Sequence, residues 1–409
     1  MPPMHRRRFL SSAIAASALP PLRAAARTTV LDETLRSGIA RRHIPAVVGM
    51  VAGPNSTLYS GAFGIRDSSG VAVKADSIFA IASMTKPITT AAALQLVEQG
   101  KAGLDEPVGR YLPSFNKIQV LQGFDADGNP VLRAALKPPT LRHLLTHTSG
   151  FCFDLWDGDM FRYSSKTKPG AEGVPGPLMF EPGTRWQYGQ GIEWAGRLVE
   201  AVSGMTLEDY FQQRILRPLG MVDTSYVLPP DKFDRLVSVY QRSETGELRQ
   251  QGPRKQPAAP KSFNGGGGLY STAADYVRFM QMILHDGAGP DGVSILQARS
   301  VASMKQNQIG ALTAGKMKTF QPEVSGDVDM QPGQTEKWGL GFLINTTPYA
   351  GGRSAGSLAW AGFFNTFFWI DPQRSLSAVI LMQFLPFVDR DAVAMLDNFE
   401  HAVYESRLG

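Results

Sequence analysis

Residues 79–100 read FAIASMTKPITTAAALQLVEQG and hold a serine and a lysine three positions apart, Ser83 and Lys86. The apolar and small residues that follow Ser83 recur with helical spacing, and Gly100 is placed to end the helix. Side chains at i and i+3 share one face of a helix, so the hydroxyl and the amine are expected within reach of each other. Pro87 suits a first turn, where no amide hydrogen is needed. The pattern predicts a helix that begins at the Ser-x-x-Lys sequence.

This serine–lysine pair is a candidate for nucleophilic catalysis. A serine hydroxyl attacks well only when a nearby base takes its proton, and a lysine can be that base where burial or positive charge keeps it neutral. A helix N-terminus adds positive character and free N–H groups that stabilise an oxyanion. A second Ser-x-x-Lys sequence, Ser165–Lys168, runs directly into Pro169-Gly170, so no helix is expected to align its side chains. Ser83 is therefore the predicted nucleophile.

Four blocks of sequence resemble the serine β-lactamase and penicillin-binding superfamily. They are residues 79–115, LRHLLTHTSGF at 141–151, EPGTRWQYGQGIEWAGRLVE at 181–200 and NGGGGLYSTAADYVRFMQMIL at 264–284. The blocks keep the family's order, the resemblance covers most of residues 35–400, and it is strongest to the class C-like branch with the family VIII carboxylesterases. It implies an α+β, β-lactamase-like fold, in which an antiparallel sheet flanked by helices is joined to an all-helical subdomain.

The resemblance also implies roles for residues beyond this helix. The family's Tyr-x-Asn motif is matched by Tyr188-Gly189-Gln190, in which Tyr188 would be a general base or proton shuttle beside Lys86. Whether Lys86 or Tyr188 is the primary base stays open. Gln190 replaces the usual asparagine, and its extra methylene shifts the expected contact to substrate or to Lys86. The plain alternative for Tyr188 is a tyrosine of the core.

No Lys-Thr-Gly motif is present, and its position reads Trp360-Ala361-Gly362, the Trp-x-Gly pattern of the esterase branch. Tryptophan offers apolar and stacking surface where lysine would attract a carboxylate, which favours neutral, short or aromatic esters. The resemblance implies that the backbone N–H of Phe363, after Gly362, joins that of Ser83 in the oxyanion hole. The alternative for Trp360 is an ordinary strand residue.

Ser354 is the centre of a second candidate motif, G-x-S-x-G at 352–356, followed by Asp371 and His401 in the order of an α/β-hydrolase triad. In that fold a strand precedes the serine and a helix follows it, whereas here the flanking sequence is a loop and then a β-rich stretch. A surface turn is therefore the favoured interpretation of this motif.

Metal and cofactor motifs are weak. His143 and His147 have the i, i+4 spacing of zinc ligands, but the glutamate of H-E-x-x-H is missing. Residues 125–128 resemble a calcium loop without its later ligands, and a hairpin turn explains them better. Residues 265–268 lack the Lys-Ser/Thr of a phosphate loop and predict a tight turn near the site, while the Ser-x-Asn sequence at 262–264 is redundant with Tyr188. We therefore predict no metal and no cofactor.

Residues 1–26 have the order of an export signal. The basic cluster Arg6-Arg7-Arg8 precedes a short apolar run, two prolines and three alanines, and the segment has four arginines and no acid. Arg-Arg-x-Phe-Leu resembles a twin-arginine signal, which predicts a periplasmic or secreted bacterial protein that engages the export machinery. A mitochondrial presequence is the alternative. The run is too short to span a membrane.

The charge balance follows from this segment. The chain of 409 residues carries 41 Lys+Arg against 36 Asp+Glu, a net charge of +5 that could suggest a nucleic-acid partner. Removing the four arginines of residues 1–26 leaves 37 cations against 36 anions, a net charge of +1. Nothing then favours nucleic acid. Cys152 is the single cysteine, so the chain forms no internal disulfide.

The remaining pattern predicts one β-lactamase-like serine hydrolase domain over residues 27–409. Apolar runs at 45–66 predict a hairpin, and three more β-like runs lie between 339 and 383. Both ends of the chain are thus expected to build one sheet, with an α/β part over about 27–105 and 225–409 and a helical part over about 106–224.

The predicted reaction is hydrolysis of small carboxylic esters through an acyl-enzyme on Ser83. Three alternatives remain: a β-lactamase, D-amino-acid peptidase or small-amide hydrolase with the same nucleophile; a transacylase; and a catalytically silent binding protein. An aromatic cluster is expected either to wall the substrate pocket or to belong to the core. Its members are Phe151, Phe153, Trp156, Phe161 and Tyr163.

Overall fold

The computed structural model describes residues 21–168, 170, 173–289 and 292–408. Its largest sheet has seven antiparallel strands in the order β2-β1-β13-β12-β11-β10-β9. The strands are β1 (Ala46–Ala52), β2 (Thr57–Gly64), β9 (Glu336–Trp338), β10 (Leu343–Asn345), β11 (Leu358–Gly362), β12 (Thr366–Asp371) and β13 (Leu376–Leu381). The two ends of the chain therefore share one sheet, as the sequence predicts.

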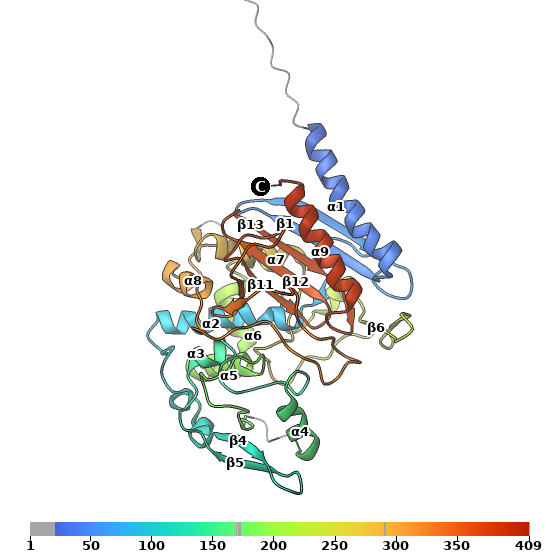
Figure 1. The fold of residues 1–409 in the computed structure, drawn as a ribbon. Helices are drawn as coiled ribbons and strands as arrows, with labels where there is room; N and C mark the ends of the chain where they lie inside the picture. The colour runs from blue at the N-terminus through green and yellow to red at the C-terminus, as the bar shows by residue number, and fades with distance from the viewer. Residues whose placement is uncertain (1–20, 169, 171–172, 290–291, 409) are drawn as a thin grey trace, which may run out of the picture.

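Helices cover both faces of this sheet (Figure 1). Neighbouring residues of β12 point to opposite faces, because side chains alternate along a strand. Trp369 packs on Phe399 of α9 (Arg390–Glu405), whereas Phe368 packs on Tyr276 of α7 (Ala273–Leu284). The long helix α1 (Pro21–Arg42) lies beside α9. Every residue of β1, β12 and β13 is buried in consequence, and the strands are mostly apolar.

The segment between the two halves of the sheet is mainly helical. It contains α3 (Leu141–Leu145), α4 (Gly158–Lys166), α5 (Gly191–Ser203) and α6 (Leu207–Phe211), which continues as a π-helical turn, Gln212–Leu216. A hairpin of β4 (Gln119–Phe124) and β5 (Pro130–Ala134) also lies here, so the expectation of an all-helical part is wrong.

Asp125 closes this hairpin through its side chain, which accepts hydrogen bonds from the backbone N–H groups of Asp127 (3.0 Å) and Asn129 (2.8 Å). Residues 125–128 are thus a turn, as predicted.

The shorter elements are β3 (Phe79–Ala80), β6 (Tyr240–Arg242), β7 (Leu248–Gln250), β8 (Tyr270–Ser271), β14 (Phe384–Leu385), α8 (Ala298–Lys305) and the 3-10 turns Ala82–Thr85, Val108–Arg110, Pro113–Lys117 and Pro230–Arg235.

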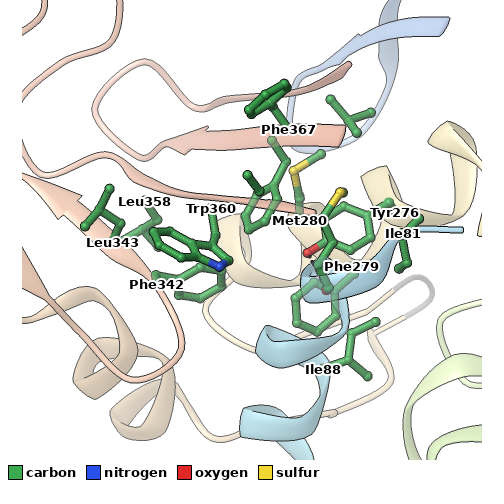
Figure 2. Packing of buried hydrophobic residues seen from close by; sticks show 14 of the residues in the cluster. Ile81, Ile88, Tyr276, Phe279, Met280, Phe342, Leu343, Leu358, Trp360 and Phe367 are labelled. Carbon is green, nitrogen blue, oxygen red and sulfur yellow. Dashed lines mark hydrogen bonds between the residues drawn. The ribbon is translucent and has the colours of Figure 1, made fainter. Parts of the chain in front are cut away.

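Helix α2 (Lys86–Glu98) passes between the sheet and the helical segment. Its residues from Lys86 to Leu96 are all buried, and α5 packs against it. Figure 2 shows the apolar packing here, with Ile88 from α2, Phe279 from α7 and Trp360 from β11. The helix ends two residues before Gly100, whose φ of 67° suits glycine.

The predicted signal of residues 1–26 lies largely outside the described residues, and 21–26 form the start of α1. Within the described ranges, no helix combines the length and apolar character needed to cross a membrane.

A buried ion pair fastens α9 to the turn before β11. The Arg353 guanidinium donates to both carboxylate oxygens of Glu400, and the Arg353 backbone N–H adds a third bond of 2.9 Å. Both side chains are under 10% exposed. Removing one partner leaves the other charge buried and unpaired, which makes the loss much larger than for a pair on the surface.

We predict that Arg353→Met lowers the free energy of unfolding by about 3–5 kcal/mol. Arg249→Met is the matched control, because Arg249 pairs with Glu247 in solvent, where a pair contributes roughly 0–1 kcal/mol. Urea unfolding followed by circular dichroism measures both values. Equal losses of unfolding free energy in the two variants would contradict the claim that the Arg353–Glu400 pair stabilises the fold more than a surface pair does.

Candidate active site

Ser83 lies in the 3-10 turn Ala82–Thr85 directly before α2, one turn earlier than the α-helix itself. Ala82 has φ of 44°, a left-handed conformation that costs a non-glycine residue free energy. Hydrogen bonds on both sides hold this turn: the Ile81 N–H donates to the Leu269 carbonyl (3.0 Å), and the Tyr276 hydroxyl donates to the Met84 carbonyl (3.0 Å). Such strain is typical of functional sites.

The Lys86 amine is almost fully buried, and it points at Ser83. Its Nζ donates to Ser83 Oγ (3.0 Å) and to the carbonyl of Gly266 (2.6 Å). It also lies over the ring of Tyr188, 4.9 Å from the centroid, and 5.6 Å from that of Phe153. The structure therefore brings together the serine, lysine and tyrosine that the sequence singled out, although Tyr188 is 105 residues away from Ser83.

Tyr188 is buried in the loop before α5, and its phenol oxygen has a fixed donor. The Trp360 Nε1–H donates to this oxygen (3.1 Å), and the two rings are 4.8 Å apart. Because the oxygen accepts from the indole, its own proton is free to point elsewhere. The indole N–H also faces the atom on which negative charge develops when Tyr188 gives up its proton.

His147 also packs against Tyr188, with ring centroids 4.6 Å apart. Burial, followed by the positive charge of Lys86, lowers the pKa of His147 well below its usual value. The imidazole is therefore neutral near pH 7, and its Nδ1 accepts the Gly189 N–H (3.4 Å). His143 instead caps α3, where its Nδ1 accepts the Thr140 N–H (3.1 Å). The two histidines thus have separate structural partners.

Ser83, Lys86 and Tyr188 open onto a cavity of about 840 Å³. Its lining is largely apolar and comes from several parts of the chain. These include the turn at Ser83, residues 153–156, residues 233–239 with 250–257, residues 264–270, and residues 363–364. Of the predicted aromatic cluster, Phe153 and Trp156 line the cavity. Phe151 packs in the core on Phe115, and Phe161 stacks on Phe320 instead.

Trp360 does not line this cavity. Its side chain is buried behind Tyr188, so the structure gives it a place different from the expected substrate-facing surface. Alternation along β11 predicts on which face of the sheet residue 360 lies. The sequence does not say which part of the chain covers that face, so it could not show that Tyr188 lies between Trp360 and the cavity. Gln190 likewise lies outside the lining, at the N-cap of α5, where its side chain makes no capping bond.

The end of β11 lies against the turn that carries Ser83. A Cβ atom at Gly362 would be 2.3 Å from the Ile81 carbonyl oxygen and 2.3 Å from Thr366 Oγ1, so only glycine fits. The next residue, Phe363, lines the cavity together with Ser83. This close approach is compatible with the oxyanion hole that the resemblance implies for the N–H groups of Ser83 and Phe363.

The alternative motifs take no part in this site. Ser354 lies in a turn followed by β11, as expected, and its N–H donates to Asp371 (2.8 Å). His401 contacts the carbonyl of Ala350 (3.0 Å), so no triad forms. Ser165 is on α4, which ends before Lys168. In the part of the chain that is described, no group of three His, Cys, Asp or Glu residues is arranged to hold a metal.

Sequence reasoning missed Glu193, a polar residue of the site, and set aside Asn264 as part of a Ser-x-Asn sequence redundant with Tyr188. Both line the cavity, and Asn264 Oδ1 accepts the Gly266 N–H (2.7 Å). The predicted tight turn at 265–268 is present and supplies the carbonyl that holds Lys86. A signal existed for Glu193, because it lies five residues after Tyr188 in the block that carries the resemblance.

Comparison with known proteins agrees with this geometry. A family model described as Beta-lactamase matches residues 31–400. The chain belongs to the β-lactamase family. It is 32% identical to monacolin J acid methylbutanoyltransferase of Aspergillus terreus over 93% of this chain and 97% of the relative. It is also 32% identical to lovastatin esterase of Penicillium rubens, over 80% and 85% of the two chains.

The fold of this β-lactamase family member is also that of solved structures. A mutant of simvastatin synthase, LovD, from Aspergillus terreus superposes with a TM-score of 0.81 at 30% identity, covering 94% of this chain and 98% of the other. The β-lactamase-like fold predicted from the sequence is thereby confirmed. The relatives are acyltransferases and esterases, which supports serine hydrolase or acyltransferase chemistry in general.

The position of Trp360 yields a kinetic prediction. Trp360→Phe keeps a ring but removes the donor to Tyr188, and a lost buried hydrogen bond of about 1–2 kcal/mol lowers kcat by roughly tenfold. The KM for an ester should stay within about twofold, because residue 360 does not line the cavity. Trp156→Phe is the control that changes the cavity wall, and it should alter KM. An increased KM with unchanged kcat in Trp360→Phe would contradict this role.

Proposed function

We propose that this protein hydrolyses small carboxylic esters through an acyl-enzyme on Ser83. The observation that carries the proposal is the Lys86 amine, which is buried and hydrogen-bonded to Ser83 Oγ at the end of a largely apolar cavity. A buried amine that is hydrogen-bonded to a serine hydroxyl can activate that serine as a nucleophile. The cavity is within the size range of small-molecule sites.

The reaction would proceed in two halves. Ser83 Oγ attacks the ester carbonyl carbon while its proton passes to Lys86 or through Tyr188, and the N–H groups of Ser83 and Phe363 would hold the oxyanion. The tetrahedral intermediate collapses as the C–O bond to the alcohol breaks, and the alcohol leaves with that proton. Water then attacks the acyl-enzyme, giving the acid and restoring Ser83.

Acyl transfer to an acceptor other than water is a second candidate function. The similarity to a methylbutanoyltransferase over nearly the whole chain supports it, and so does the size of the cavity, which exceeds the needs of a short acyl group. An alcohol or amine seated along residues 233–239 and 250–257 would take the acyl group in place of water. Hydrolysis and transfer share every step up to the acyl-enzyme.

The ester proposal is tested by comparing p-nitrophenyl esters of two to eight carbons with a chromogenic cephalosporin. We expect ester turnover to exceed cephalosporin turnover by at least tenfold, and Ser83→Ala to abolish it. Ser354→Ala is the matched control and should retain wild-type activity, because Ser354 lies outside the cavity. Strong cephalosporin turnover with feeble ester turnover would overturn the proposal.

The same assay separates transfer from hydrolysis. Candidate alcohols and amines are added during ester turnover, and new esters or amides are sought by mass spectrometry. Acyl products that form at the expense of the free acid would make transfer the main reaction. Failure of a fluorophosphonate to label the protein would instead favour a silent binding protein.

We also propose that residues 1–26 direct export by the twin-arginine route. The proposal rests on the sequence of the segment alone. Expression in a bacterium followed by cell fractionation and N-terminal sequencing tests it: a periplasmic protein that begins near Arg27 is expected. A protein that stays in the cytoplasm with residues 1–26 intact would contradict the proposal.

A further inference from the structure

Glu193 is an acidic side chain beside the catalytic pair, and no step described so far uses it. It is the third residue of α5 and lines the same cavity as Ser83 and Lys86. An acid in the first turn also suits the positive end of a helix, so a purely structural role is the competing account.

The turn at Gly266 joins Glu193 to Lys86. The Gly266 carbonyl accepts the Lys86 Nζ hydrogen bond of 2.6 Å. On its other side, a Cβ atom at residue 266 would be 2.5 Å from Glu193 Cγ and 3.0 Å from Glu193 Oε1. Thus the carboxylate packs directly on the residue that holds the amine. Asn264 secures this turn, because its Oδ1 accepts the Gly266 N–H (2.7 Å).

The charges around this pair are few. Lys86 faces Tyr188, the Phe153 ring and the neutral His147, and its positive charge acts on Glu193 and on His147. Around Glu193 the remaining groups are Arg197, from the next turn of α5, and the buried phenol of Tyr226. Asp154 is the other acid in the cavity lining as described.

We propose that Glu193 is the counter-ion of Lys86, a positioning residue whose negative charge sets the pH dependence of Ser83 reactivity. The inference rests on the proposed function, since it assigns a partner to the base of that reaction. A buried ammonium is costly unless an opposite charge lies near it. Burial raises the pKa of the Glu193 carboxyl, while Lys86, Asn264 and Arg197 oppose the rise.

This pairing predicts a shift that a structural residue would not produce. Removing the negative charge makes a positive charge at residue 86 less favourable, so the pH profile of Ser83 reactivity should move to lower pH. We expect Glu193→Gln to move the midpoint of this profile down by about one unit, the lower end of the shift that a nearby opposite charge causes. If neutral Lys86 is the base, the variant should react up to about tenfold faster below the wild-type midpoint.

The readout is the rate at which a fluorophosphonate labels Ser83, measured from pH 5 to 10, because it needs the nucleophile and no particular substrate. Glu193→Gln and Glu193→Ser are made in parallel, so that one neutral variant suffices if the other fails to fold. Glu193→Asp keeps the charge and should hold the midpoint within about 0.3 unit. Glu208→Gln is the matched control, since Glu208 is a half-buried acid of α6 outside the cavity, where it accepts the Tyr226 N–H.

Two outcomes support the proposal, and two overturn it. A downward shift of the rising limb supports it with neutral Lys86 as the base, and a downward shift of the falling limb supports it with Lys86 acting in its charged form. An unchanged midpoint in both neutral variants, with rates reduced at every pH, overturns it. Wild-type protein that is not labelled at any pH overturns the proposed function as well, which separates the two failures.

Discussion

The structure depends on one buried amine. Lys86 Nζ lies between Ser83 Oγ and the Gly266 carbonyl, inside a molecule where a lone charged group would cost several kcal/mol. Burying it requires walls on every side: α2 itself, the sheet with α7, and the helical segment with Tyr188. The interior position of α2 is thus both the core of the fold and the means of activating the serine, so stability and chemistry share the same residues.

The walls around this amine come from segments far apart in the sequence, and each is fixed by a close backbone contact. Gly362 lets β11 contact the turn that carries Ser83. Gly265 packs against Gly196 of α5, because a Cβ atom added at residue 265 would be only 2.9 Å from the Gly196 Cα. Trp360 then holds Tyr188 from the sheet side, while His147 holds it from the helical side. A rigid shell of this kind keeps catalytic groups in place without reorganisation.

Much of this could be predicted from sequence where one local rule decides. Helices α7 and α9 have strong periodicity, the strands of both chain ends are apolar runs, and Ser83, Lys86 and Tyr188 are carried by motifs. Contacts across the fold escaped prediction. Strand alternation places Trp360 on a face but does not name its neighbour, and nothing local joins Glu193 to Gly266. The turn at 125–128 was predicted, but the strands β4 and β5 on either side of it were missed because they are short and half-exposed and lie between helices.

The central claim is that Ser83 carries the acyl group. An ester that deacylates slowly is mixed with the enzyme, the reaction is quenched in acid, and the protein is digested and examined by tandem mass spectrometry. The account predicts that the acyl mass is found on Ser83 and disappears as the acid product forms. An acyl group on another residue, Ser354 above all, would contradict the account.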